Sequence, residues 1–598
     1  MHIMFNTTLN FKRRLESTEE ADYYDVLKKG RELVSGSKNN RDILIVPTAS
    51  LPQASSNNTG VGNLASDESQ AFLNFAKKYW GINEVQILPI GQYYRNGEQY
   101  PLYSGTTMDF GNHVVDIKSL LTKEDYEKLV KENKISDRVN FSNVVDYNSY
   151  QEKLLKEMYE NLSGAQKADF EKFKTLNRAR LLPKGLFRAL CDKYGSSDYK
   201  NWDKIDSHLF DDRVVSAKDR EKRISEILKT KGKITDYYIF KQFLAEISLK
   251  KSKTELNKNG LRLNGDMPCG FSYDEVWANP KAFLKDYTNI WGTPVLDYSS
   301  KDAEKLLREK VRLYSEFFDG FRVDAAWVYT EPRIKNLTTG KYETQYWGDR
   351  FLKIIEDEAK NVKGKDFDLK NIMYEFAAEP SVFSVYDDLS LKPYVEKRVK
   401  IYTSDYLSED WGAAKTFSDR GWSKDLFILG AANHDSKEIK YDEKQAEILG
   451  KILKKSKLSL RNFGEFLNAK FAEPLSGVNN MIFFMPAMGM KGQYKDNADL
   501  VKNYTAKIPA DYEDYYIRAV GKNEAYNPMY CLEQQFKAQG LDKKNPELYE
   551  KIIKYKEILQ DKNSHNKNYF IAAVAVLVLG VIGEIYLLLS QKNSNRRQ

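Results

Sequence analysis

The sequence contains little cysteine and little histidine. Its 598 residues include three cysteines, Cys191, Cys269 and Cys531, which are far apart. This spacing excludes a dense disulfide framework and favours a reducing compartment. The five histidines show no paired spacing. The chain therefore lacks a zinc-binding motif, and we predict no metal site.

The chain also lacks a concentrated block of positive charge. Its formal net charge of +8 is the balance of 93 basic and 85 acidic residues, and no long basic block precedes the extreme C-terminus. A nucleic-acid-binding protein needs a concentrated basic patch, so we predict no nucleic-acid partner. Residues 1–20 lack the apolar core of a signal peptide.

Long hydrophobic runs are absent except near the C-terminus. Residues 569–590 read YFIAAVAVLVLGVIGEIYLLLS, which is long enough to cross a bilayer as a helix, with Glu584 as the single charge near one end. A buried core helix is the alternative, but the hydropathy rule favours a transmembrane helix. Lysines before this segment favour a cytoplasmic N-terminal part. We therefore expect a cytoplasmic protein that is tail-anchored to a membrane.

Short apolar runs alternate with helical patterns along the rest of the chain. Residues 300–318, for example, carry apolar side chains at helical spacing. Near-continuous apolar strands that alternate with helices indicate a parallel sheet, and eight such units indicate a closed barrel. We therefore predict an α/β fold, a (β/α)8 TIM barrel, with strands at 42–51, 84–90, 261–268, 318–326, 371–376, 399–405, 426–435 and 481–490.

One interval between the predicted strands is too long to be a loop. Residues 118–240 are charged, rich in lysine and helical in pattern, and we expect a helical subdomain inserted after the second strand. Residues 545–560 are also helical in pattern and suit a stalk or a packed last helix. The predicted organisation is an N-terminal helical extension (1–40), barrel strands 1 and 2 (41–117), the inserted subdomain (118–240), barrel strands 3 to 8 (241–525), a helical stalk (526–568), the transmembrane helix (569–590) and a basic tail (591–598).

Charged residues fall at the ends of several predicted strands. In a β/α barrel the catalytic groups gather at the carboxyl ends of the strands. Four strands therefore deliver acidic groups to one rim. Asp266 ends the third strand, Arg322 and Asp324 the fourth, Glu375 the fifth, and His434 and Asp435 the seventh.

The stretch FFDGFRVDAAWV, residues 317–328, contains two of these charges in an apolar strand. Residues two apart point to the same face of a strand, so Arg322 and Asp324 share a side. The arginine would keep the aspartate ionised, as a nucleophile requires, while Glu375 in a more apolar setting would keep a proton. Such a carboxyl pair is the apparatus of glycoside cleavage. A lone Arg-x-Asp is more often a structural ion pair, but three such features on ordered strand ends favour catalysis.

Several segments resemble a known family. The segment LNGDMPCGFSYDEVWANPKAF (263–283) is similar to a motif of the 4-alpha-glucanotransferases, the amylomaltases or disproportionating enzymes of glycoside hydrolase family 77. Three earlier segments resemble that family's N-terminal barrel segments, and NYTAKIPADYE (503–513) resembles its closing motif. The three earlier segments are IVPTASLP (45–52), QILPIGQ (86–92) and FGNHVVDI (110–117). The resemblance covers roughly residues 40–520.

This resemblance implies a role for each residue at the rim. It implies that Asp324 is the nucleophile, Glu375 the general acid/base and Asp435 the transition-state stabiliser. It further implies substrate-binding roles for Arg322, His434, Asp266, Trp277 and Tyr103. The expected activity is glucan transfer on α-1,4-glucans by a retaining double displacement, with an α-glucan and a sugar acceptor as partners and no cofactor.

The sequence also departs from the family pattern. Ala325 stands where the family has a histidine, and Phe376 stands where it has an acidic residue. The loop between NPKAFLKD and WGTP is short, and in relatives a longer loop covers the acceptor site. A lid excludes water, so we expect more hydrolysis here than in lidded relatives. An α-amylase-like hydrolase and a weakly active, membrane-tethered glucan-binding scaffold are the alternatives.

Overall fold

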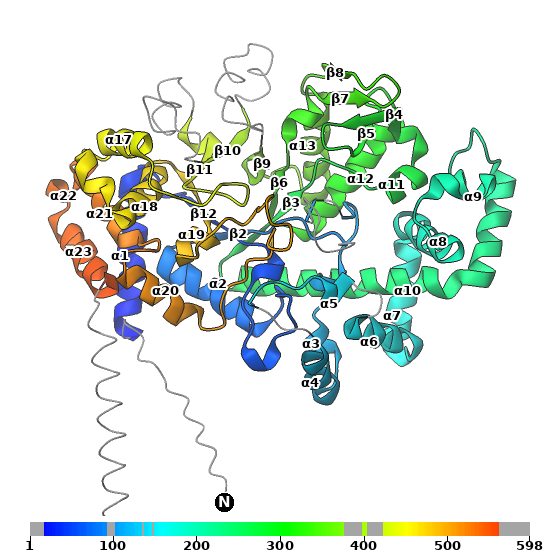
Figure 1. The fold of residues 1–598 in the computed structure, drawn as a ribbon, viewed down its shortest axis with the longest axis horizontal. Helices are drawn as coiled ribbons and strands as arrows, with labels where there is room; N and C mark the ends of the chain where they lie inside the picture. Colours follow the sequence, from blue (N-terminus) through cyan, green and yellow to red (C-terminus); the bar gives the residue numbers. More distant parts are fainter. Residues whose placement is uncertain are drawn as a thin grey trace, which may run out of the picture.

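A closed barrel of parallel strands lies at the centre of the molecule (Figure 1). The computed structural model describes residues 17–92, 102–103, 105–133, 137–145, 149–375, 397–403 and 423–560. The strands are β1 (Arg41–Ile45), β2 (Glu84–Gln86), β3 (Arg262–Met267), β6 (Gly320–Val323), β9 (Ile372–Tyr374), β10 (Val399–Thr403), β11 (Phe427–Gly430) and β12 (Asn479–Phe483). They follow the order β1-β12-β11-β10-β9-β6-β3-β2, so all eight predicted strands are confirmed.

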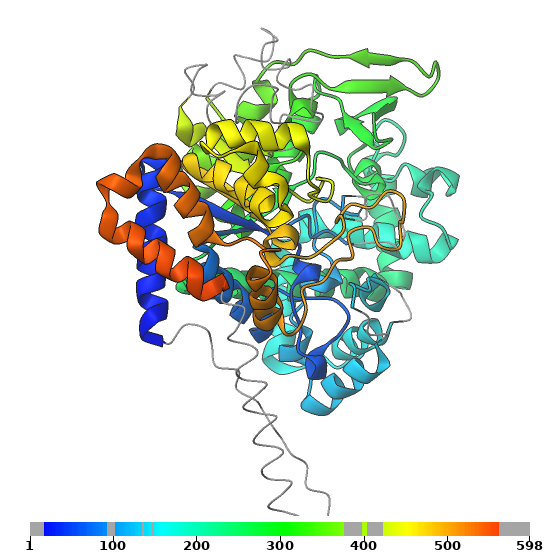
Figure 2. The same cartoon turned by 60° about the vertical axis from the view of Figure 1, so that its left-hand side comes forward.

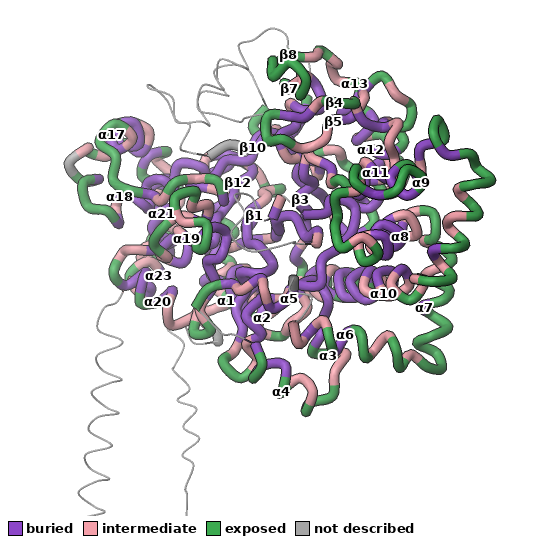
Figure 3. The backbone as a smooth tube through the Cα atoms, turned by 45° about the vertical axis from the view of Figure 1, so that its right-hand side comes forward, coloured by how far each residue is buried: buried purple, intermediate pink, exposed green. Residues whose placement is uncertain are grey.

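The barrel strands are buried because helices cover their outer face. Figure 3 shows the strands among the most buried parts of the chain. Helix α12 (Lys301–Phe317) illustrates the cover, since the Ser300 side chain caps its first turn by accepting from the Asp302 amide. Its apolar residues recur at helical spacing and are buried. Helices α2 (Asp67–Trp80), α13 (Arg350–Lys363), α17 (Glu443–Ile452), α18 (Phe463–Ala472) and α19 (Phe484–Met488) occupy other connections.

The predicted insertion between β2 and β3 is helical where the structure describes it. Its longest helix, α10 (Ala217–Lys258), bends at Lys231 and runs from the outer end of this subdomain to the barrel (Figure 1). The helix continues beyond the predicted boundary at residue 240. The other helices are α3 (Ile117–Leu120), α4 (Lys123–Glu132), α5 (Ser142–Val145), α6 (Tyr150–Glu160), α7 (Gly164–Leu176), α8 (Arg178–Tyr194) and α9 (Lys204–Ser207). Part of this subdomain has a hydrophobic cluster of its own, which includes Phe187 and Trp202.

A second sheet, which the sequence pattern did not predict, lies at one end of the barrel. Its strands are β4 (Phe283–Asn289), β5 (Pro294–Leu296), β7 (Arg333–Asn336) and β8 (Tyr342–Thr344), in the antiparallel order β5-β4-β7-β8. Figure 2 shows it beside the barrel in green. Strand β8 is exposed along its whole length, so it carries no alternation of apolar and polar residues that would identify a strand. Helix α11 (Tyr273–Ala278) precedes this sheet.

The N-terminal and C-terminal helices pack together against the barrel (Figure 2). Tyr23 of α1 (Ser17–Ser35) meets Tyr555 of α23 (Pro546–Gln560) edge to face, with ring centroids 5.5 Å apart. Lys551 also pairs with Asp22 at 2.6 Å. The described part of the segment 526–568 is therefore a packed layer rather than an extended stalk, and α23 corresponds to the packed last helix that was the second alternative for residues 545–560. The layer also contains α20 (Tyr512–Gly521), α21 (Pro528–Gln539) and α22 (Leu541–Lys544).

The predicted transmembrane segment 569–590 lies outside the described residues. Among the helices that the structure does describe, none has both the length and the apolar character required to span a bilayer.

Candidate active site

Neighbouring barrel strands bring the predicted acidic residues to one end of the barrel. Strand β3 pairs with β6 so that Asp266 lies opposite Arg322. Strand β6 then pairs with β9, and Asp324 and Glu375 follow the last residues of these two strands. Because parallel strands all end at the same side of a barrel, residues separated by more than a hundred positions in sequence become neighbours.

Arg322 joins three of these carboxylates. Its Nη1 atom lies 2.7 Å from Asp266 Oδ1 and 3.1 Å from Asp324 Oδ1. Its Nη2 atom lies 2.7 Å from Glu375 Oε2. The arginine side chain is 3% exposed, whereas those of Asp324 and Glu375 are 15% and 18% exposed. One buried cation therefore supports two carboxylates that remain accessible from the barrel mouth.

Two backbone amides also point at these carboxylates. The Cys269 amide donates to Asp324 Oδ2 at 3.3 Å, and the Ala325 amide donates to Glu375 Oε2 at 3.2 Å. Ala325 adopts the left-handed conformation, with φ of 43°, which costs an alanine about 1 kcal/mol. The turn directly after Asp324 is thus strained and directs an N–H at Glu375. Sequence reasoning missed both donors because a backbone amide has no residue-type signature.

Contrary to the expectation from the sequence, Arg322 acts on the pKa of Asp324 and on that of Glu375 in the same direction. Burial raises the pKa of both Asp324 and Glu375, Arg322 opposes that rise in each case, and neighbouring carboxylates add to it. The sequence led us to expect that Arg322 keeps Asp324 ionised while Glu375 keeps a proton, but the same guanidinium also pairs with Glu375 and so favours the ionised form of both groups. Each carboxyl group is nevertheless poised to exchange a proton more readily than a solvated one.

Tyr103 connects this cluster to the loop after β11. Its hydroxyl donates to Asp266 Oδ2 at 2.9 Å and lies 2.8 Å from His434 Nε2. His434 Nε2 is in turn 3.2 Å from Asp435 Oδ2. Since the tyrosine proton is directed to Asp266, we assign the His434 proton to Nε2. The structure therefore brings seven of the eight predicted site residues into one continuous network.

Asp435 has two further partners that sequence reasoning missed. Lys495 Nζ lies 2.8 Å from Asp435 Oδ1, and the Tyr504 hydroxyl donates to the same oxygen at 3.4 Å. Burial acts to raise the pKa of Asp435, but the interactions with His434 and Lys495 outweigh it and hold the pKa well below its usual value. Asp435 is therefore ionised at neutral pH, unlike a carboxylic acid that must donate a proton.

Trp277 does not join the network, which corrects the prediction that it contacts sugar. Its side chain is buried in the hydrophobic cluster of the inserted subdomain, where its ring centroid lies 5.4 Å from that of Phe187 and 6.1 Å from that of Trp202. Its indole N–H donates to the Asp206 carbonyl at 2.8 Å. Phe376, the other residue singled out from the family pattern, lies outside the described residues.

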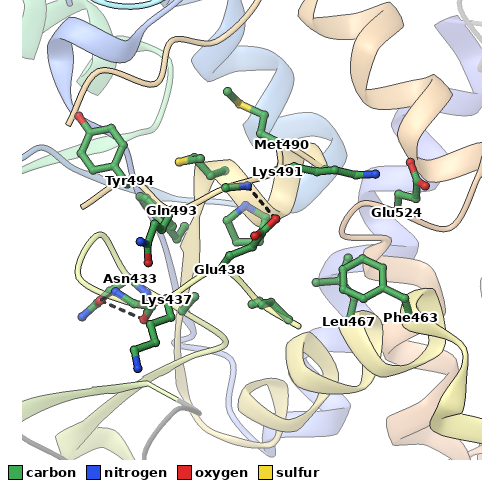
Figure 4. A pocket seen from close by; sticks show the side chains of 18 residues that line it. Asn433, Lys437, Glu438, Phe463, Leu467, Met490, Lys491, Gln493, Tyr494 and Glu524 are labelled. Carbon is green, nitrogen blue, oxygen red and sulfur yellow. Dashed lines mark hydrogen bonds between the residues drawn. The ribbon is translucent and has the colours of Figure 1, made fainter. Parts of the chain in front are cut away.

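A pocket lies behind the loop that carries Asp435 (Figure 4). Asn433 forms one wall, and its Oδ1 accepts from the amides of Asp435 at 2.9 Å and Ser436 at 3.0 Å. Glu438 accepts from the Gly492 amide at 2.8 Å and so joins this loop to the loop that carries Lys495. Local side-chain caps of this kind fix the backbone on both sides of the acidic residue.

Comparison with known proteins gives a consistent family assignment. A model of the 4-alpha-glucanotransferase family matches residues 46–361, just over half of the chain. The 4-alpha-glucanotransferase of Solanum tuberosum, chloroplastic/amyloplastic, is 24% identical over 276 residues, 41% of this chain and 45% of the relative. The 4-alpha-glucanotransferase of Thermus thermophilus is 27% identical over 261 residues, 41% of this chain and 47% of the relative. The chain thus spans about half the length of these curated relatives.

Solved structures agree on the fold. The amylomaltase from Streptococcus agalactiae in complex with acarbose superimposes with a TM-score of 0.62 at 14% identity, covering 82% of this chain and all of that chain. The amylomaltase from Corynebacterium glutamicum gives 0.56 at 13% identity, covering 91% of this chain and 77% of that one. The matched family segment includes Asp324 but ends before Glu375 and Asp435. The geometry of the barrel mouth, independently of that match, brings Glu375 beside Asp324.

Proposed function

The chain belongs to the 4-alpha-glucanotransferase family, glycoside hydrolase family 77, and from this premise we propose that it transfers segments of α-1,4-glucan from a donor to an acceptor sugar. The observation that carries the proposal is the pair Asp324 and Glu375, held by one guanidinium at 3.1 and 2.7 Å. Two carboxyl groups this close to a common partner suit a retaining double displacement, in which no water needs to fit between them.

In the first step, an Asp324 oxygen attacks the anomeric carbon of the donor. The glycosidic bond breaks, and Glu375 gives its proton to the departing oxygen. The raised pKa of Glu375, which burial causes, favours the protonated form required for this step. The Cys269 amide at 3.3 Å and Arg322 at 3.1 Å stabilise the negative charge of Asp324 before attack.

In the second step, the ionised Glu375 takes a proton from the acceptor hydroxyl. The acceptor oxygen then attacks the anomeric carbon, and the bond to Asp324 breaks, which restores both carboxyl groups. Arg322 and the Ala325 amide hold the Glu375 carboxylate between the two steps. Asp435, which His434 and Lys495 keep ionised, would accept hydrogen bonds from ring hydroxyls as the ring distorts.

Maltotriose tests this proposal directly. The full-length chain should convert maltotriose into glucose and longer maltooligosaccharides, which chromatography separates. Asp324→Asn and Glu375→Gln should each abolish the ladder, whereas Asp357→Asn, an exposed carboxylate on α13, should leave it unchanged. A wild-type protein that binds maltooligosaccharides without turning them over would support the glucan-binding scaffold instead.

A hydrolytic side reaction is the second candidate, and the short connection between β4 and β5 favours it. Only residues 290–293 separate these strands, and a short turn offers little cover to keep water from a glucosyl-enzyme. We expect a measurable gain of reducing ends alongside the ladder. A ladder without any net gain of reducing ends would contradict this expectation.

Residues 569–590 support a separate proposal, attachment to a membrane with the catalytic part on the cytoplasmic side. The support is the apolar sequence and the lysines before it. The full-length chain should float with liposomes in a density gradient, and the double variant Leu577→Arg/Leu579→Arg should not. The matched variant Leu577→Ala/Leu579→Ala should still float. Protease protection in sealed vesicles would report which side the catalytic part occupies.

A further inference from the structure

Helix α12 carries a lysine where its pattern calls for an apolar residue. Lys310 is fully buried and lies among Leu306, Leu307 and Val311, which cover the barrel. Lysine is almost never fully buried without a partner because the ammonium group must leave water. A lysine in this position therefore calls for a specific role.

The Lys310 ammonium group bridges two carbonyls of the loop after β3. Its Nζ atom donates to the Pro268 carbonyl at 2.6 Å and to the Gly270 carbonyl at 2.8 Å. The ring of Phe271 lies against the same ammonium, with its centroid 4.1 Å away. Two charge-assisted hydrogen bonds and a cation–π contact thus fix a loop of four residues from one point.

The residue between the two bridged carbonyls is Cys269, whose amide donates to Asp324 at 3.3 Å. The Pro268 carbonyl and the Cys269 N–H belong to one planar peptide unit, so holding that carbonyl also fixes the direction of the N–H. Lys310 precedes β6 on the same helix–strand unit, so it links the helix before the nucleophile to the loop that contacts the nucleophile. The contacts form a chain from Lys310 to the loop, from the loop to the Cys269 amide, and from that amide to Asp324.

We propose that Lys310 is a positioning residue for the nucleophile, which acts by holding the Cys269 amide against the Asp324 carboxylate. This inference rests on the proposed function, in which Asp324 attacks the donor sugar. Lys310 itself does not contact the substrate in this proposal. Loss of the clamp should therefore slow the chemical step and change the acidity of Asp324, with little effect on substrate binding.

The charged groups around Lys310 determine the pH dependence that we expect when it is replaced. Burial lowers the pKa of Lys310 to about 8, and the charges of Glu275, Cys269 and Asp324 oppose this while Lys184 adds to it. The amide donor at Asp324 favours its ionised form. Removal of Lys310 eliminates both a nearby cation and the control of that donor, and both losses raise the pKa of Asp324.

The experiment compares Lys310→Met with Lys305→Met, which removes an exposed lysine from the same helix. Both are assayed as full-length proteins on maltotriose over a range of pH, with thermal unfolding measured in parallel. For Lys310→Met we expect kcat to fall about 10-fold to 100-fold, KM to stay within about threefold, and the acidic limb of kcat/KM to move to higher pH. Lys305→Met should match wild type in all three.

Two results would overturn the inference. The first is a folded Lys310→Met protein with an unmoved acidic limb and wild-type kcat. The second is a loss confined to KM or to thermal stability. If Lys310→Met does not fold, Lys310→Gln takes its place: its neutral and shorter side chain weakens the clamp, so a smaller fall in kcat and a smaller shift of the acidic limb in the same directions are expected, and no change in either would overturn the inference. Absence of turnover in wild type would instead reject the proposed function, so the two failures are distinguishable.

Discussion

The two ends of the barrel treat buried charge in opposite ways. At the end where the strands begin, Glu84 is 2% exposed and has two arginine partners. Arg41 binds both of its oxygens at 2.8 Å, Arg262 approaches to 3.3 Å, and Asn264 donates at 2.7 Å. Burial acts to raise the pKa of Glu84, but the arginines and Asn264 outweigh it and lower the pKa.

At the end where the strands finish, three carboxylates share one arginine. One arginine, Arg322, serves Asp266, Asp324 and Glu375, and the pKa of each of the three carboxyl groups is raised, chiefly by burial. Both ends contain carboxylates paired with arginine, so residue type alone does not distinguish a structural cluster from a catalytic one. The number of cations per carboxylate does distinguish the two clusters. The cluster at the carboxyl end of the strands has too few cations to offset the effect of burial on the pKa of its carboxyl groups, and this suits it to catalysis.

The largest expected effect tests this contrast through activity. Asp324→Asn should lower the rate of maltotriose disproportionation about 10³-fold or more, because the amide cannot form the glucosyl-enzyme. Glu84→Gln makes the same kind of replacement at the other end and should retain most of the activity of the protein that remains folded. Comparable losses in the two variants, measured as kcat per folded molecule, would remove the functional distinction between the ends.

Substitutions at the two ends should have opposite effects on the free energy of unfolding: the variant at Glu84 should lose stability, and the variant at Glu375 should gain it. Glu84→Gln should destabilise the fold by about 3 kcal/mol, because it leaves Arg41, whose side chain is 12% exposed, without its carboxylate partner. Glu375→Gln should raise the unfolding midpoint at neutral pH, because the fold disfavours ionised Glu375. Urea titrations of both variants against wild type would measure this, and a stabilised Glu84→Gln protein would contradict the contrast.

The contributions of Glu84 and Glu375 to stability depend on pH in opposite directions. The folded pKa of Glu84 lies below its ordinary value of 4.5, so its contribution to stability is present above pH 4.5 and is lost as pH falls through the folded pKa. The folded pKa of Glu375 lies above 4.5, so its penalty develops above pH 4.5 and is absent below it. The stability difference between wild type and Glu375→Gln should therefore vanish in acid.

A smaller effect is expected where a cation is supplied to the rim from a loop. Lys495→Met should lower kcat/KM about 10-fold, because the pKa of Asp435 rises when the cation 2.8 Å away is removed. Lys491→Met, an exposed lysine of the same loop, is the matched control and should behave as wild type. Equal effects of the two substitutions on kcat/KM would show that Lys495 acts only through general surface charge.

The smallest effect uses Cys269 as a reporter of the negative charge at the mouth. Burial first, and then the charge of Asp324, raise the pKa of its thiol well above the usual range. Asp324→Asn should therefore speed alkylation of Cys269 by iodoacetamide several-fold, because the thiolate is the reactive form. Cys191 serves as an internal reference, and mass spectrometry of the two peptides gives both rates. An unchanged ratio would indicate that the Asp324 charge does not reach this thiol.

Much of the barrel was predictable because its strands are buried on both faces. Runs such as ILI in β1 and FILG in β11 are continuous in hydrophobicity, which is the pattern of a central parallel strand. The rule that functional groups follow such strands then predicted that Asp324 and Glu375 lie together at one end of the barrel, as they do. The exposed hairpin β7–β8 lacks this signal, since its contacts with solvent leave its side chains free to be polar.

The rest of the site depends on loops whose paths the sequence does not specify. Lys495 is 60 positions from Asp435 and reaches it only because two loops meet at the barrel mouth. Trp277 shows the opposite error, since its place in a family-like motif says nothing about the direction of its side chain. The short helix α11 turns it toward Phe187 and Trp202. Motifs predicted which segments approach the site, and packing decided which side chains enter it.

Tyr103 has a consequence for how this protein can change over evolutionary time. Its single hydroxyl is within 3.3 Å of partners on Asp266, Arg322 and His434, so four side chains share one atom. Residues coupled in this way do not contribute independently, and the effect of changing one depends on the identity of the others. Substitutions at these four positions should show strong epistasis. A new substrate preference is therefore more accessible through the loops around the mouth than through any single replacement within this quartet.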